Sequence, residues 1–205
     1  MNNPSDQSYS ELLSNIQLEW NKAEAAIKSA EIVSHDVIVP SINELRYAGR
    51  RIVDALQKKA TGGRGEEIEA LLNDAIFDCR RARYDAVDAA TSVVSLNVEL
   101  LVQNVGYDTL LSAAPDFRDF FEKLQRLREK IVTTRQQRER RDSIYSDIET
   151  ADLPQMLGEY ERLRGLESVL KSIARKRRWE LLISRMTGVA GLVVGLLGAL
   201  LALFH

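Results

Sequence analysis

The chain has 205 residues, enough for one or two domains, and its formal net charge of −2 does not fit a general nucleic-acid coat protein. It has only 4 prolines and 11 glycines, and this scarcity of helix-breaking residues favours long helices over a strand-rich fold. The single cysteine, Cys79, excludes an intramolecular disulfide and a zinc site made of cysteines. The two histidines, His35 and His205, are far apart in the sequence, so we expect no metal site, no Ser-His-Asp triad and no cofactor.

The first three quarters of the chain predict an all-α fold, a cytosolic bundle of about four long helices. Residues 1–9 are polar, so we expect them to be disordered and expect no signal peptide. From residue 10 to residue 153, apolar residues recur every three or four positions, as they do on one face of a helix. This periodicity predicts helices from Ser10 past Ala30, from Pro40 to Ala60, from Glu66 to about Gln103 and from about Asp116 to Ile148.

Two stretches of this region depart from the helical pattern. Residues 61–65 (Thr-Gly-Gly-Arg-Gly) predict a flexible connector, because the Gly-Lys-Ser/Thr sequence of a phosphate-binding loop does not follow at the required spacing. Residues 135–141 (Arg-Gln-Gln-Arg-Glu-Arg-Arg) have no apolar face. We therefore expect this second stretch to project into solvent or to meet a ligand or partner.

The last predicted helix starts at Pro154, forms a stalk over residues 154–182 and continues into a single transmembrane helix over residues 183–205. Met186–Phe204 is a run of nineteen residues without a charge. At about 1.5 Å per residue, this run approaches the ~30 Å thickness of a bilayer's hydrocarbon core. The basic residues 171–178 precede it and are expected to stay on the cytoplasmic side, which places the N-terminal domain in the cytoplasm. The alternative is a buried core helix, which is rarely so uniformly apolar.

Small residues in the predicted membrane helix are spaced by three or four positions, so they share one helix face. A face of glycines lets a second helix approach closely, and a chain with one span is expected to meet another copy of itself. We therefore predict homo-oligomerisation, as a dimer or as a ring around a narrow pore. The predicted face consists of Ser184, Gly188, Gly191, Gly195, Gly198 and Ala202.

Arginines beside tyrosines form two clusters on the second and third predicted helices. Proteins commonly use this combination to hold phosphates and stack bases. The candidate ligand-binding residues are Arg46, Tyr47, Arg50, Arg51, Arg80, Arg83 and Tyr84. A projection at about 100° per residue places Arg83 inside the apolar stripe of its helix, where an unpaired charge would be very costly. The alternative is that these arginines pair inside the bundle with Glu24 and Glu31 and fix the register of the helices.

No motif predicts an enzyme. Helical-bundle ribonucleases of the HEPN type carry an arginine followed four to six residues later by a histidine, and neither histidine here has an arginine at that distance. Paired carboxylates such as Asp85 and Asp88 are three residues apart on a charged helix, and a solvated face explains them more simply.

Residues 40–51 (Pro-Ser-Ile-Asn-Glu-Leu-Arg-Tyr-Ala-Gly-Arg-Arg) and residues 79–90 (Cys-Arg-Arg-Ala-Arg-Tyr-Asp-Ala-Val-Asp-Ala-Ala) look like pieces of small bacterial defence effectors. The plan of the chain, a helical body with one terminal span, resembles the HalA effectors of Hailong-type anti-phage systems. The resemblance implies a location in the bacterial inner membrane. It also implies a companion nucleotidyltransferase, whose single-stranded DNA product would bind the Arg/Tyr clusters and control a channel.

Two functions of different classes remain open from the sequence. The first is a ligand-controlled, homo-oligomeric membrane effector, an ion channel or a membrane-disrupting protein, which responds to a nucleotide or to single-stranded DNA. The alternative is a C-terminally anchored scaffold or adaptor, whose helical body recruits a protein partner.

Overall fold

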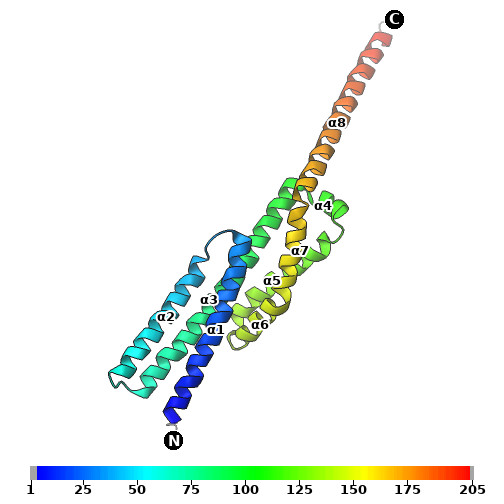
Figure 1. The fold of residues 1–205 in the computed structure, drawn as a ribbon. Helices are drawn as coiled ribbons and strands as arrows, with labels where there is room; N and C mark the ends of the chain where they lie inside the picture. The colour runs from blue at the N-terminus through cyan, green and yellow to red at the C-terminus, as the bar shows by residue number, and fades with distance from the viewer. Residues whose placement is uncertain (1–3, 204–205) are drawn as a thin grey trace. The chain divides into compact units, whose positions relative to one another are not determined.

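The computed structural model describes residues 4–203, and it describes the side chains of residues 9–134, 136–184, 186 and 187. Within residues 4–203 all regular structure is helical, which confirms the all-α prediction (Figure 1). The elements in chain order are α1 (Pro4–Ser34), α2 (Val39–Ala60), α3 (Gly65–Val105), α4 (Tyr107–Ala113), α5 (Phe117–Gln136), the 3-10 turn η1 (Arg138–Arg140), α6 (Arg141–Asp147), the π-helical turn η2 (Ile148–Asp152), α7 (Leu153–Gly165) and α8 (Glu167–Leu203).

The helix boundaries differ from the sequence prediction in three places. First, α1 begins at Pro4 rather than at Ser10. Second, the fourth predicted helix is interrupted by η1, in the stretch that has no apolar face to pack. Third, the predicted single C-terminal helix is divided near Leu166, whose backbone N–H bonds to the carbonyl of Leu163 in a 3-10 pattern.

The contacts divide the chain into two compact units. The first consists of residues 1–97 and 120–160, and the second of residues 98–119 and 161–205. In the first unit, α1, α2 and the beginning of α3 enclose an apolar core, and successive helices run in opposite directions (Figure 1). Its fully buried members include Ala48, Ala75 and Cys79. Such small side chains let the helix backbones approach one another closely.

Local sequence explains the two turns that connect these helices. Pro40 lies in the first turn of α2, where its fixed φ suits a helix start and its missing N–H is not needed. Gly62 follows α2 with φ +74°, a conformation that a residue with a side chain rarely adopts. Lys58 and Lys59 occupy the last turn of α2, where cations interact favourably with the helix dipole.

In the second unit, α4 packs against α8, and two arginines of α8 fasten this contact. Arg177 donates to the hydroxyl groups of Thr109 (3.4 Å) and Ser112 (3.1 Å). Arg178 donates to the backbone carbonyl of Asn104 (2.8 Å), one of the last carbonyls of α3, which has no partner within its own helix. Part of the basic stretch at residues 171–178 thus holds the second unit together.

Beyond this basic stretch, α8 carries large apolar side chains in contact with solvent, from Trp179 (62% exposed) to Met186 (73% exposed). Among the residues whose side chains are described, no helix is both long and apolar enough to cross a membrane. The side chains of the predicted transmembrane helix lie outside the described residues from residue 188 onward. Of the predicted self-association face, only Ser184 is therefore described; Gly188, Gly191, Gly195, Gly198 and Ala202 are not.

Candidate functional site

Arg83 is the largest fully buried side chain of the described core, with 1% of its surface exposed. Its place in the apolar stripe of α3, between the buried Cys79 and Ala86, follows from the helical spacing. Its guanidinium forms ion pairs with three carboxylates, one each from α1, α6 and η2. Nη1 lies 3.3 Å from Glu19, Nη2 contacts Asp142, and Nε lies 3.1 Å from Glu149.

Two tyrosines cover this cluster, which we call the Arg83 cluster. The Tyr84 hydroxyl donates to Asp142 (3.0 Å), and its ring stacks on Tyr145 with 4.2 Å between the ring centroids. The Tyr145 hydroxyl in turn donates to Asp88 (2.7 Å). Burial, and then the charge of Asp142, raise the pKa of Tyr84 to about 12, and burial likewise raises the pKa of Tyr145. Both hydroxyl groups therefore remain donors at neutral pH.

The carboxylates of the Arg83 cluster differ in their ease of ionisation. Burial raises the pKa of Glu149 to about 7, although the charge of Arg83 opposes this rise. Burial also acts to raise the pKa of Asp142, but the charge of Arg83 and the hydrogen bond from Tyr84 outweigh it and lower that pKa. Glu149 is therefore the member of the cluster that gains and loses a proton near neutral pH.

The seven predicted ligand-binding residues fall into two groups in the structure. One group is exposed, and the other, which we call the engaged group, already interacts with side chains of other helices. On the outer face of α2, Arg46 donates to Asn43 (3.0 Å), Tyr47 is 59% exposed, and Arg50 pairs with Asp54. The engaged group consists of Arg51, Arg80, Arg83 and Tyr84.

Arg51 and Arg80, like Arg83, already have carboxylate partners. Arg51 links α2 to α3 through Asp74 (2.9 Å) and Asp78 (2.7 Å). Arg80 lies 3.7 Å from Glu19 and 4.0 Å from Asp142. A ligand at these positions would have to replace existing ion pairs.

The sequence left open that these arginines pair inside the bundle with Glu24 and Glu31. The structure shows arginines paired inside the bundle, but with other carboxylates. The carboxylate that reaches Arg83 from α1 is Glu19, whereas Glu24 accepts a hydrogen bond from the indole of its neighbour Trp20 (3.0 Å). The signal for Glu19 was present, since it lies three residues after Ile16 and four before Ala23 on the apolar stripe of α1. Glu149 gave no comparable signal, because η2 changes the helical spacing around it. Asp142 gave none either, because it directly follows the stretch of residues 135–141 that has no apolar face.

Neither a metal site nor a reactive thiol is found in the described part of the chain. No group of three His, Cys, Asp or Glu residues there is arranged to hold a metal ion. Burial raises the pKa of the Cys79 thiol to about 12, so that almost none of it is the reactive thiolate at neutral pH.

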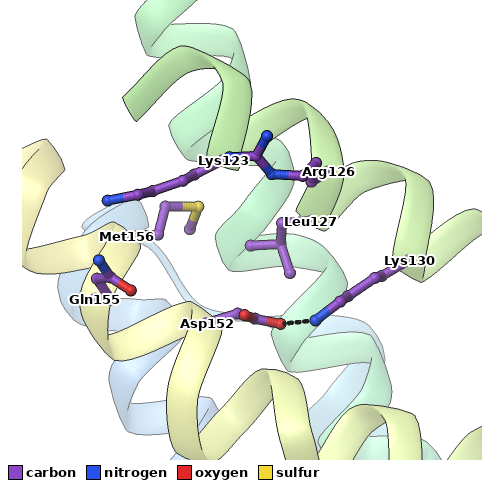
Figure 2. Close-up of a pocket in the computed structure, with 7 residues that line it drawn as sticks. All are labelled: Lys123, Arg126, Leu127, Lys130, Asp152, Gln155 and Met156. Carbon is purple, nitrogen blue, oxygen red and sulfur yellow. Dashed lines mark hydrogen bonds and ion pairs between the residues drawn. The ribbon is translucent and has the colours of Figure 1, made fainter. Parts of the chain in front are cut away.

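A cavity of about 110 Å³ lies between α5 and the segment formed by η2 and the start of α7. Figure 2 shows cationic side chains from α5 reaching over it, opposite Asp152 and Gln155. The ammonium group of Lys130 pairs with Asp152 at 2.6 Å across one end of the cavity. The lining residues are Lys123, Arg126, Leu127, Lys130, Asp152, Gln155 and Met156.

Comparison of the chain with protein-family models, with curated proteins and with solved structures found no match.

Proposed function

We propose that this chain is a membrane-anchored effector, whose helical body lies in the cytoplasm and whose α8 crosses the bacterial inner membrane and associates with copies of itself to permeabilise it. The main support is the exposure of Leu181, Leu182 and Ile183. Three successive residues on a helix are about 100° apart and point in different directions. No single protein surface would cover all three, whereas a surrounding lipid phase would.

The charges on α8 support the proposed orientation. Its basic residues cluster at residues 171–178, and Arg185 is the last of them before the uncharged run of residues 186–204. The exposed Trp179 lies between them, and an indole ring is well suited to a membrane–water boundary. Positive charge is retained on the cytoplasmic side, the side of the helical body. Because Arg177 and Arg178 also bind α3 and α4, a change in the second unit would act directly on the helix that enters the membrane.

We also propose that a nucleotide or a single-stranded DNA ligand controls this effector in anti-phage defence, as the likeness to the Hailong effectors implies. Of the predicted clusters, the exposed Arg46, Tyr47 and Arg50 on α2 offer a surface that such a ligand can reach without breaking a buried ion pair. A companion nucleotidyltransferase would supply the ligand.

Membrane potential in expressing bacteria, followed with a voltage-sensitive dye, tests the effector function. The wild-type chain is expected to depolarise the membrane. The double variant Gly191→Leu/Gly195→Leu is expected to abolish this effect, because leucine side chains keep the helices apart. Val193→Leu adds bulk on the opposite face of the same helix and is expected to retain the activity. Depolarisation by the double variant, or a monomeric wild-type protein in detergent, would contradict the proposal.

An anchored scaffold is the second candidate, and exposed apolar side chains on the body support it. Val53 and Leu56 on α2 and Phe77 on α3 are all more than half exposed, as is typical of residues that contact a protein partner. Replacing residues 186–204 by an unrelated leucine-rich span distinguishes the two functions. A scaffold would remain active after this replacement, whereas a self-assembling effector would not.

A further inference from the structure

The cavity beside α5 is bordered by three cations on one side of a single helix. Lys123, Arg126 and Lys130 are three and four residues apart, a spacing that places side chains on the same helix face. Beneath them, Leu127 and Met156 form a floor that is almost fully buried. The cavity therefore combines a cationic rim with an apolar base (Figure 2).

The two outer cations have partners across the cavity, and the middle one does not. Lys123 pairs with Glu159 at 2.7 Å, and Lys130 pairs with Asp152 at 2.6 Å. Among the described side chains, the carboxylate near Arg126 is Glu122, 3.6 Å away on the same exposed helix surface. Such an exposed pair four residues apart on one helix contributes little. The middle position of this row thus lacks an acid from the opposite segment.

On the side of the cavity opposite α5, Figure 2 shows the amide of Gln155 beside the end of Lys123. It donates to Glu159 (3.1 Å), so it is already oriented by the outer ion pair of Lys123. Its neighbour in the lining, Met156, offers no charge. An anion that entered the cavity beside Arg126 would therefore meet a cation that no carboxylate of the opposite segment pairs with.

We infer that this cavity binds a phosphate group, with Arg126 as its principal ligand and Lys123 and Lys130 on either side. A guanidinium matches two phosphate oxygens with its planar fork, and lysines act as flexible point charges. A phosphate offers three strong acceptor oxygens, which suits three separate cations better than a planar carboxylate does. The apolar floor excludes water from one side and strengthens these contacts.

This inference goes beyond the proposed function and does not require α8 to cross a membrane. It also places the anion site on α5 and α7, away from the Arg/Tyr clusters of α2 and α3. The phosphate group has two possible sources, a soluble phosphate monoester and the headgroup of an anionic lipid, and both present the same chemistry to Arg126.

Calorimetric titration of the full-length protein in a neutral detergent tests the site. Inorganic phosphate is expected to bind, and acetate at the same ionic strength is expected to bind about tenfold more weakly. Arg126→Gln is expected to weaken phosphate binding about tenfold, because it removes a charge-assisted pair of hydrogen bonds. Arg126→Lys keeps the charge but loses the planar fork, so its affinity for phosphate is expected to lie between those of the wild type and Arg126→Gln. Arg118→Gln removes one exposed arginine from the start of the same helix and serves as the matched control, whereas Arg46→Gln tests the exposed surface of α2.

Equal phosphate binding by the wild type and Arg126→Gln would overturn the inference, as would equal binding of acetate and phosphate. Loss of binding in Arg46→Gln but not in Arg126→Gln would assign the anion site to α2 instead. Circular dichroism of both variants checks the fold, which these exposed side chains are not expected to alter. Parallel titrations with AMP and with phosphatidic acid in mixed micelles identify the source, and saturable, Arg126-dependent binding of either one supports the site.

Discussion

The stability of the first unit is expected to fall as pH rises through neutrality, and Glu149 is expected to cause this fall. Burial raises the pKa of Glu149 from its ordinary 4.5 to about 7; Arg83 and Lys22 oppose the rise, whereas Asp142 and Glu19 add to it. Between these two pH values the folded protein binds a proton that the unfolded chain has released. The free energy of unfolding contributed by Glu149 is therefore fully present below pH 4.5 and is lost as pH rises through about 7.

The size of this loss follows from the pKa difference. One pKa unit corresponds to about 1.4 kcal/mol, so the loss reaches up to about 3 kcal/mol. Glu149→Gln cannot ionise and is expected to remove most of the decline between about pH 5 and about pH 8. Asp142 has the opposite dependence, because its pKa is lowered, but its stabilisation is lost only as pH falls below 3.8, outside this window.

Urea unfolding of the full-length protein in detergent, at about pH 5 and at about pH 8, tests this prediction. Trp20 packs against the core of the first unit and reports its unfolding by fluorescence, once Trp179→Phe has removed the other indole. Glu161→Gln, an exposed carboxylate on α7, is the matched control and is expected to leave the pH dependence unchanged. An identical decline in Glu149→Gln and the wild type would refute the role of Glu149.

Three further predictions concern the same unit. Arg83→Met leaves buried carboxylates without their cation and is expected to lower the free energy of unfolding by about 3–5 kcal/mol; a loss below about 1 kcal/mol would mean that the cluster is open to water. Tyr145→Phe removes the hydrogen bond to Asp88 but keeps the stacked ring, so urea titration should show a loss of about 1 kcal/mol. Cys79 should react with a thiol reagent only after unfolding, and fast reaction in the native protein would contradict its burial.

The helical periodicity of the sequence predicted the architecture well where a helix has one apolar face. It also predicted that Arg83 points inward, because that conclusion needs only the spacing within one helix. Helical periodicity could not predict the partners of Arg83. Glu19 and Asp142 are about sixty residues away in the sequence, and which carboxylate meets a buried cation depends on how the helices pack.

Helix ends were predicted less well than helix faces. The division between α7 and α8 was missed, because the leucines on both sides of Leu166 keep their spacing and Gly165 alone is a weak signal within a helix. The cavity beside α5 was missed for a different reason. Its cations belong to an ordinary charged helix face, and only their position opposite Gln155 and Met156 makes that face a candidate site.

The turn η2 connects the two sites of the first unit. Glu149, its second residue, reaches Arg83, and Asp152, its last residue, pairs with Lys130 at the cavity. A π-helical turn is wider than an α-helical one, so these two residues, three apart, serve different sites. A phosphate that competes for Lys130 would release Asp152 and disturb the turn that holds Glu149. Coupling of this kind is reciprocal. Phosphate itself loses a proton in this range, so its affinity should change between about pH 5 and about pH 8 in both proteins. The change should differ between the wild type and Glu149→Gln, and equal changes in both would show that the two sites are independent.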